Sequence, residues 1–265
     1  MSPVAETLLA PDEPPAAIVL PGDAGRGVLL VCCHAANGVP RALGDLGVPA
    51  ADRERHIAWD IGAAAVTRAL SARLGLPAVL SGYTRLAADC NRAPEQPGVM
   101  PEESDGTPVP ANRSLDDAAR ARRLAALHAP YHAAIAGELA RIEAARDGGG
   151  AALVAIHSFT PAMAGVARPW HVGVLWHSDR RLPLPLLARL RREPGLVVGD
   201  NEPYDARKGF GYTLGRHAEA AGRPSAMIEV RQDEIGDEAG VLHWSGLLAR
   251  VLADVLGEAG LFRGA

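Results

Sequence analysis

The sequence predicts an α/β fold with three layers, α/β/α, in which helices cover both faces of a mainly parallel, mixed sheet. Short continuous apolar runs, such as GVLLVCC at Gly27–Cys33 and AALVAIHS at Ala151–Ser158, are typical of strands buried on both faces. Segments with helical spacing alternate with these runs, and this alternation favours parallel pairing through helical crossovers. No internal repeat or linker interrupts the pattern, so we expect a single domain over residues 1–265.

The N-terminal part predicts an irregular start followed by a central strand. Residues 1–23 are rich in proline, and we expect them to be irregular apart from a possible edge strand at Ala17–Leu20. The apolar run Gly27–Cys33 then predicts a buried strand that stops at His34. Gly, Asn and Pro residues after His34 indicate a loop.

The next segment predicts a helix, a strand and an extended piece. A helix is expected over Ala51–Leu74, because Asp52 can cap it, apolar residues recur at helical spacing, and Gly75 ends it. A strand is expected at Ala78–Tyr83, followed by an extended segment at Leu86–Cys90.

Residues Asn91–Arg113 contain five prolines and show no apolar period. The segment is long for a plain connection in a compact domain, so we expect it to cover a site; a surface insertion is the alternative. Beyond it the alternation resumes. The expected helices are Ser114–Arg146, Leu184–Arg192, Tyr212–Ala221 and Glu238–Leu256, and the expected strands are Ala151–Ser158, Val172–Trp176, Leu196–Gly199 and Met227–Val230.

Composition and charge argue against nucleic-acid binding, secretion and a membrane partner. A net charge of −4 and a pI near 6.1 argue against a broad nucleic-acid-binding face. The N-terminus lacks the pattern of a secretory signal, and no window reaches the apolar length of a membrane span, so we expect no membrane partner. Three cysteines suit a reducing cytosol, and we expect a cytoplasmic protein. Of these cysteines, Cys32 is interpreted as a small buried residue that ends a strand.

Polar residues whose side chains can bind a metal or take part in catalysis occur within or just after the predicted strands. His34 and His157 close two apolar runs, Asp89 and Arg92 follow a third, and Glu229 lies within the last. Ligands bind outside the carboxyl ends of strands in open α/β sheets, so these groups can converge on one cleft. Their spacing lacks a tight ligand signature, and the pattern alone leaves both a metal site and purely structural histidines open.

Several motifs together resemble the N-formylglutamate amidohydrolase family. The likeness extends from about Val31 to the end of the last helix, and it implies the phosphorylase/hydrolase-like α/β fold of that family. The motifs are CHAANGVP at Cys33–Pro40, HIAWD at His56–Asp60, DCNR at Asp89–Arg92, SDGTPVPANR, HSFTP at His157–Pro161, PWHVGVLW, DNEPYD and YTLGRHAE.

A more distant resemblance connects the chain with the zinc carboxypeptidase superfamily. HSFT is similar to the segment that carries its last zinc ligand, DCNR to its Asn-Arg substrate-binding element, and IEVR at Ile228–Arg231 to the strand with its catalytic glutamate. The chain also departs from related patterns. Asn37 stands where the carboxypeptidases have a glutamate ligand, and Cys33 stands where many relatives have glutamate before the histidine.

The resemblance implies a metal site formed by His34, Asp60 and His157, with a divalent metal, Zn as the first candidate, as the cofactor. Two neutral imidazoles, a carboxylate and an open position form a catalytic zinc site. Asp60 is placed on the helix after the His34 loop. Its alternatives are a solvated helix acid and a partner that orients a ligand histidine.

The resemblance further implies that Glu229 is the general base, and that Arg92 and Asn91 bind the α-carboxylate of the substrate. For Glu229 the alternative is a buried ion pair with Arg231 or another base. The further histidines in family-like motifs, His56, His171 and His217, are expected to support the site or line its wall, and His177 is expected at the surface.

The implied activity is hydrolysis of an N-acyl amino acid, with N-formyl-L-glutamate, cleaved to formate and glutamate, as the best candidate. The expected partner is therefore a small molecule. Two alternatives stay open: a carboxypeptidase or deacylase that acts on a larger substrate, and a non-catalytic binding protein that retains the fold.

Overall fold

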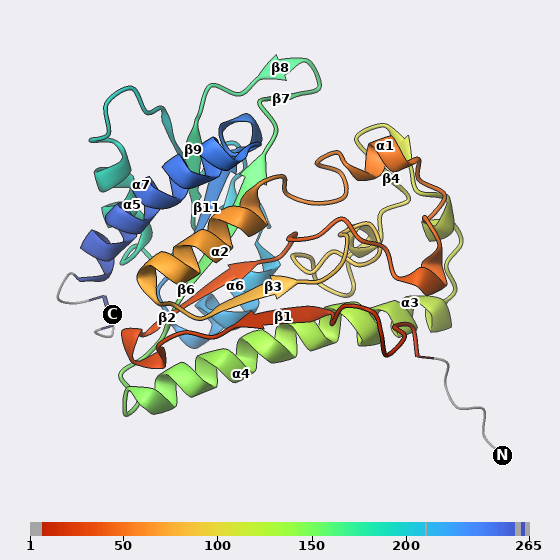
Figure 1. The fold of residues 1–265 in the computed structure, drawn as a ribbon, viewed down its shortest axis with the longest axis horizontal. Coiled ribbons are helices and arrows are strands. Elements are labelled where there is room, and N and C mark those ends of the chain that lie inside the picture. Colours follow the sequence, from red (N-terminus) through yellow and green to blue (C-terminus); the bar gives the residue numbers. More distant parts are fainter. Residues whose placement is uncertain (1–6, 210, 258–260, 263–265) are drawn as a thin grey trace.

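The computed structural model describes residues 7–209, 211–257 and 261–262, and its centre is a seven-stranded mixed sheet (Figure 1). The strands run in the order β1–β3–β2–β6–β11–β9–β10. From β3 to β11 they are parallel, whereas β1 joins β3 and β9 joins β11 antiparallel, and β10 lies parallel to β9. Their bounds are β1 Ala17–Leu20, β2 Val28–Cys32, β3 Ala78–Ser81, β6 Ala152–Phe159, β9 Val172–Leu175, β10 Val198–Asp200 and β11 Ser225–Arg231.

Helices cover both faces of this sheet, which confirms the predicted three-layer α/β/α class. On one face α2 (Ala63–Leu74) packs against α7 (Glu238–Leu256), which also contacts α5 (Pro183–Leu190). On the other face α4 (Ala129–Ala145) lies along β1, β2 and β3, and α6 (Tyr212–His217) lies against β6 and β11 (Figure 1).

The β2 strand shows why the apolar runs are continuous. Its side chains alternate between the faces of the sheet, so that Leu30 and Cys32 enter the core under α2 and α7, whereas Leu29 and Val31 enter the core under α4. Both faces are buried, and every position is therefore apolar. Cys32 lies fully buried at the end of the strand.

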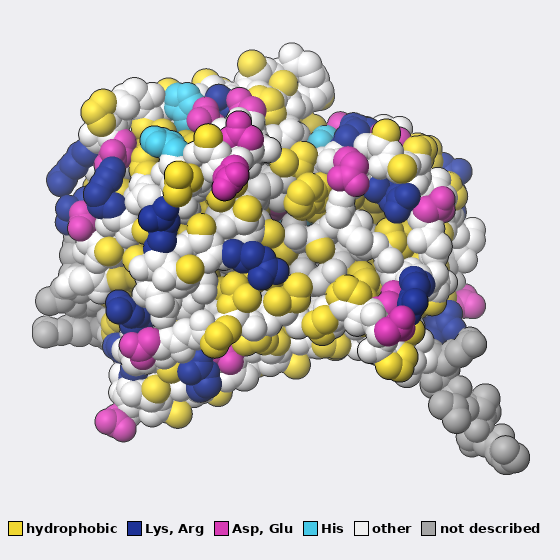
Figure 2. All heavy atoms as spheres, in the orientation of Figure 1, with side chains coloured by type: hydrophobic (Ala, Val, Ile, Leu, Met, Phe, Trp, Pro, Cys, Tyr) yellow, Lys and Arg dark blue, Asp and Glu magenta, His cyan; other side chains and the backbone are white. Residues whose placement is uncertain are grey.

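Helix α7 alone among the described residues is long and apolar enough to cross a membrane by length and composition, contrary to the expectation from the sequence windows. Trp244, Leu248 and Leu252 on this helix are buried in the core shared with α2 and α5. A core helix passes the same test, so α7 is weak evidence for a membrane span. On the face in Figure 2, basic and acidic side chains of the described residues are interspersed rather than gathered by sign.

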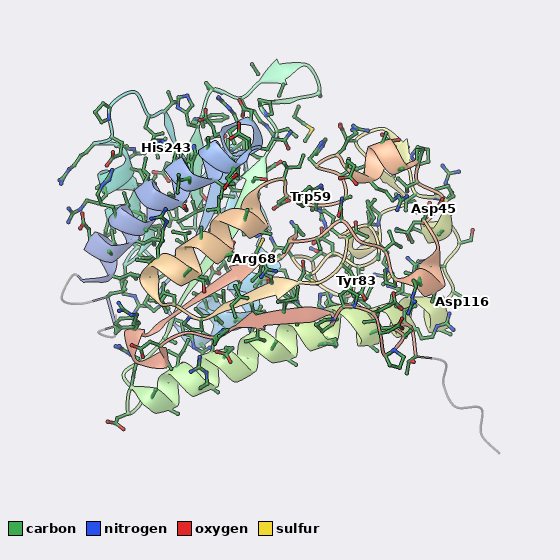
Figure 3. The ribbon with its side chains drawn as sticks, in the orientation of Figure 1. Asp45, Trp59, Arg68, Tyr83, Asp116 and His243 are labelled. Atoms are coloured by element: carbon green, nitrogen blue, oxygen red, sulfur yellow. The ribbon has the colours of Figure 1, made fainter. Side chains whose placement is uncertain are left out.

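The prediction of one helix over Ala51–Leu74 is wrong. A short α1 (Ala50–Arg53) and the longer α2 are separated by a non-helical segment, which contains Asp60 and Trp59 (Figure 3). Asp60 is therefore not on a helix as expected. The chain enters α2 through Gly62, whose φ of +79° is left-handed and accessible mainly to glycine.

The extended segment expected at Leu86–Cys90 is also wrong, because these residues form turns. The Ala87 N–H donates to the Thr84 carbonyl at 3.1 Å, which closes one of these turns. Leu86, Ala87 and Ala88 are apolar because they pack into a separate core cluster beneath the long loop.

The long segment Asn91–Arg113 contains a small hairpin, β4 (Glu103–Ser104) and β5 (Thr107–Pro108). A second hairpin, β7 (Ala162–Met163) and β8 (Val166–Ala167), projects from the end of β6 (Figure 1).

The predicted long helix after this segment is interrupted rather than uniform. It begins as α3 (Asp117–Arg123), capped by Asp116, passes through one π-helical turn at Leu124–His128, and continues as α4. Farther along, α6 ends at His217, and a 3₁₀ turn, Glu219–Ala221, completes the helical region expected there.

Candidate metal and substrate site

The ends of the central strands place two histidines and a glutamate side by side. His34 follows β2, and His157 lies near the end of β6. Glu229 on β11 is paired in register with His157 across the parallel ladder. The backbone N–H of Asp60 donates to the His34 carbonyl at 3.0 Å, which holds the segment before α2 against the end of β2.

The side chains of His34, Asp60 and His157 form a buried cluster that could hold a metal ion, because their donor atoms all lie within 4.8 Å of one another. Asp60 Oδ2 is 3.3 Å from His34 Nδ1 and 2.6 Å from His157 Nδ1. Tetrahedral coordination with bonds of about 2.0–2.2 Å separates neighbouring donor atoms by roughly 3.3–3.5 Å. The His34 contact is at that spacing, whereas the His157 contact is a direct hydrogen bond. The donor set of two imidazoles and a carboxylate thus fits a divalent transition metal.

Asp89 and Arg85 support this cluster from one side. His34 Nε2 is 2.7 Å from Asp89 Oδ1, and Arg85 donates to Asp89 Oδ2 at 2.7 and 3.1 Å. Because a carboxylate accepts, His34 Nε2 carries the proton of that bond, which leaves Nδ1 to face Asp60. An imidazole whose second nitrogen donates to a carboxylate is the usual arrangement of a metal-ligating histidine.

Charges around the cluster keep these two aspartates ionised. Burial alone would raise the pKa of Asp89, but the Arg85 guanidinium and His34 hold it well below its usual range. Burial likewise opposes ionisation of Asp60, and the adjacent His34 and His157 lower its pKa. Burial favours a neutral His157 imidazole, yet the nearby Cys33 and Asp60 raise its pKa.

Glu229 differs from the two aspartates in the direction of its pKa shift. Its side chain is 5% exposed, and Oε2 is buried without a hydrogen-bond partner. Burial is the main cause that raises its pKa to about 7. Arg231, its alternative partner, donates instead to Asp233 and Glu234 at 2.7 and 3.0 Å. An unpaired buried carboxyl group in a cleft is a marker of a functional site.

A cavity of about 270 Å³ opens beside these groups and extends to the DCNR segment. Arg92 is 41% exposed, and its Nε lies 3.6 Å from Asp89 Oδ2. Asn91 accepts a hydrogen bond on Oδ1 from the Thr213 N–H at 3.1 Å. The cavity is lined by, among others, His34, Asp60, His157, Glu229, Arg85, Asp89, Asn91, Arg92, His56, Asp105 and Tyr204.

The structure thus brings all six residues singled out in the sequence to one cavity. The two departures from related patterns do not line the cavity, although Cys33 lies close enough to His157 to raise its pKa. Asn37 donates to Glu54 at 3.0 Å, and Cys33 bonds Thr213 Oγ1 at 3.3 Å. The long segment contributes Asn91, Arg92, Ser104 and Asp105 to the wall, in agreement with the expectation that it covers a site.

The remaining histidines have separate surroundings. His56 lies in the cavity wall, 3.4 Å from Asp105. His171 accepts from the Val197 N–H at 2.9 Å, and this bond links the ends of β9 and β10. His177 is half exposed near Glu219. His217 belongs to a buried histidine cluster outside the cavity.

Arg85 and Tyr204 are among the cavity residues that were not singled out in the sequence. Arg85 bridges Asp89 and Asp60, whose Oδ1 is 3.6 Å from its NH1. Tyr204 lies in the DNEPYD motif, and its hydroxyl receives a hydrogen bond from Arg168 at 3.1 Å. The DNEPYD motif could have marked Tyr204 as a candidate site residue. Arg85 had no comparable signal, since its role depends on two carboxylates far apart in sequence.

Comparisons with known proteins identify the family and the fold. The family model for N-formylglutamate amidohydrolase matches residues 26–236. A crystal structure of a gene product from Agrobacterium tumefaciens is 36% identical, covers 94% of this chain and 98% of that chain, and has a TM-score of 0.87. An N-formylglutamate amidohydrolase from Ralstonia eutropha, 19% identical over 91% of this chain and 97% of that chain, shares the fold with a TM-score of 0.68. No curated protein matches. The chain is a hydrolase of amide carbon–nitrogen bonds and belongs to the N-formylglutamate amidohydrolase family.

Proposed function

We propose that this protein hydrolyses N-formyl-L-glutamate, or a closely related N-acyl amino acid, to the free acid and the free amine. The observation that carries this proposal is the meeting of three metal-donor side chains, an unpaired buried glutamate and an Asn-Arg pair in one cavity. The family description supplies the acyl group and the amino acid.

His34, Asp60 and His157 would hold a divalent metal, and we propose zinc because imidazole nitrogen and carboxylate oxygen suit it. When bound, such a metal acts as a Lewis acid and lowers the pKa of a water molecule. Asp89 fixes the His34 ring through the 2.7 Å hydrogen bond to Nε2, so that the other nitrogen stays directed at Asp60.

Arg92 and Asn91 bind the substrate α-carboxylate. The partly exposed guanidinium of Arg92 offers a planar fork that matches a carboxylate in two parallel hydrogen bonds. Asn91 Oδ1 is committed to the Thr213 N–H, so its side-chain NH₂ is the end that serves the ligand. These contacts orient the amide relative to Glu229, and such orientation accounts for much of a rate enhancement.

Glu229 acts as the general base and then as the general acid. It takes a proton from the attacking water while the new carbon–oxygen bond forms at the formyl carbon, and it delivers that proton to the nitrogen as the carbon–nitrogen bond breaks. A pKa of about 7 suits both transfers near neutral pH. Arg85 is the cation of the cavity wall nearest to Asp60, and it is placed to stabilise negative charge on the carbonyl oxygen.

The test compares the wild-type protein with Glu229→Gln. Elemental analysis is expected to find one metal per chain in both, whereas the rate on N-formyl-L-glutamate falls about 10²–10⁴-fold in the variant, the usual effect of losing a positioned base. Glu234→Gln is a matched control, because Glu234 bonds Arg231 and Trp244 outside the cavity. A metal-loaded wild type with no turnover on N-formyl-L-glutamate contradicts the proposed substrate. If such a protein hydrolyses other acyl amino acids instead, it is a deacylase with a different substrate.

A further inference from the structure

Three buried histidines, His128, His132 and His217, lie next to the DCNR segment but outside the cavity. His128 and His132 come from the π-helical turn and the start of α4, four positions apart and therefore on one side of the helix. Their ring centroids are 4.3 Å apart, and the His132 ring stacks on that of His217 from α6 at 5.1 Å.

The three rings are joined to the backbone on both sides of Asn91. His132 Nε2 is 3.0 Å from the Cys90 carbonyl, and His128 Nε2 is 3.0 Å from the Arg92 carbonyl. Carbonyl oxygens only accept, so both Nε2 atoms carry the proton. His132 Nδ1 is then an acceptor, and it receives the Nε2 proton of His217 at 2.8 Å. One protonation pattern therefore satisfies the whole chain of contacts.

We propose that these histidines are positioning residues that fix the backbone of Asn91 and Arg92 and thereby set the geometry of carboxylate binding. The inference rests on the proposed function of Asn91 and Arg92. Two carbonyls that bracket a dipeptide, each held by a buried imidazole, leave the intervening peptide planes little freedom to rotate. The side chains that leave this backbone then project into the cavity at a fixed separation.

Helix α6 completes the arrangement from the other side. Thr213 and His217 are four positions apart on this helix. The Thr213 N–H holds the Asn91 side chain, and its hydroxyl donates to the same Cys90 carbonyl at 3.2 Å. Helices α4 and α6 thus both hold the DCNR segment in place through hydrogen bonds.

The surroundings keep the three rings neutral, as this hydrogen-bond pattern requires. Burial lowers the pKa of His132 to about 2, assisted by His128 and His217, and lowers the pKa of His217 to about 4. Burial also lowers the pKa of His128. A second metal centre is a poorer explanation of the cluster, because the ring nitrogens already bond each other and the carbonyls. Within the described residues, only His34, Asp60 and His157 place their donor atoms within reach of one ion.

The experiment removes one donor and then restores it. His128→Leu deletes the bond to the Arg92 carbonyl, whereas His128→Gln places an amide N–H near the position of the imidazole Nε2. KM and kcat are measured on N-formyl-L-glutamate and on its α-carboxamide analogue. We expect His128→Leu to raise KM for the carboxylate substrate about tenfold, since small misplacements have effects of up to about 10²-fold. KM for the carboxamide, which lacks the carboxylate that Arg92 binds, should change little. His128→Gln should restore most of the affinity for the carboxylate substrate.

Leu139→Ala is the control for a general loss of packing, because Leu139 is buried on α4 two turns beyond His132 and its apolar side chain has no hydrogen-bonding group to hold the DCNR segment. It should lower the melting temperature without changing the preference for the carboxylate. If His128→Leu raises KM equally for both substrates, or if Leu139→Ala produces the same selectivity change, the positioning role is refuted.

A second readout is independent of turnover. Amide hydrogen exchange in residues 90–93 should accelerate in His128→Leu and in His132→Leu, with the central strands unchanged, and His128→Gln should restore protection. Unchanged exchange in these residues refutes the proposal even if the enzyme is active. A wild type inactive on both substrates refutes the proposed function, and the exchange data still decide whether the histidines hold the segment.

Discussion

Asp60, Asp89 and Glu229 show how one cavity gives buried carboxyl groups different charge states. The two aspartates lie against imidazole and guanidinium groups that lower their pKa values, whereas burial outweighs the nearby cations at Glu229 and raises its pKa to about 7. Environments that push the pKa values of neighbouring acids apart separate a permanent anion from a proton carrier. Arg85 contributes to this division through its 2.7 Å ion pair with Asp89, which lowers the pKa of that carboxyl group.

Glu229 should give the metal-free protein a characteristic pH dependence. Its pKa is higher in the folded than in the unfolded protein, so its contribution to stability is present below pH ~4.5 and is lost as the pH rises through about 7. Glu229→Gln lacks this loss. Denaturant unfolding is measured in the presence of a chelator between pH ~4.5 and about 7. Over this interval the free energy of unfolding of the variant should rise relative to that of the wild type, by on the order of a few kcal/mol. A stability difference that does not vary with pH would contradict the raised pKa.

Arg92 should contribute to activity only on substrates that carry a free α-carboxylate. Arg92→Ala is expected to reduce kcat/KM on N-formyl-L-glutamate by about 10²-fold or more and to affect the α-carboxamide analogue little, because a charged hydrogen-bond pair is lost only with the carboxylate. Arg92→Lys should restore part of the activity, since an ammonium cannot form the planar two-bond contact. Equal losses on both substrates, measured by steady-state kinetics, would instead assign Arg92 to structure or to oxyanion stabilisation.

The sequence predicted the residues of the cavity better than the contacts between them. His34, His157 and Glu229 could be found because they end or interrupt apolar runs, and the motifs marked Asn91 and Arg92. The bridging role of Arg85 could not be found this way, because it is defined by distances to side chains that only the folded sheet brings close.

At the scale of elements, the break between α1 and α2 matters most for the site. Apolar spacing predicted one helix, but a helix through residues 54–62 would leave Asp60 on a helical surface instead of directing it to His34 and His157. Helical periodicity reports which side chains are buried, and it does not report where the backbone must bend to bury them. The same limitation explains Leu86–Cys90, whose apolar residues are buried in turns rather than in a strand.

Gly62 is the residue on which this break depends. A Cβ at this position would lie 2.2 Å from the Ile235 carbonyl oxygen, and the φ of +79° disfavours any other residue. Gly62→Ala should destabilise the protein by more than about 1 kcal/mol and weaken metal retention, because the segment that carries Asp60 must shift. Gly38→Ala is the control, since nothing lies within 4 Å of its added Cβ. Thermal unfolding and metal analysis that find both variants like the wild type would refute this role.

At the scale of the whole molecule, the site joins separate parts of the fold, and metal binding should therefore stabilise all of it. Ligand binding to the folded state adds free energy of unfolding by mass action, about 4 kcal/mol when the free metal is 1,000 times its Kd. Chelation should lower the melting temperature, and readdition of zinc should restore it. His157→Ala, which removes one donor, should melt at nearly the same temperature with and without zinc. A wild type whose melting temperature is insensitive to both treatments would argue against a bound metal.

The spacing of the donors along the chain also determines when during synthesis the site can form. His34 and Asp60 are 26 residues apart, but Asp60 and His157 are 97 apart, and Glu229 follows later still. A ribosome therefore releases the first two donors long before the third, and a nascent chain can offer a metal only a two-donor site until β6 has emerged and joined β2. Completion of the proposed donor set therefore depends on the emergence of β6, and Glu229, the proposed general base, emerges after all three donors.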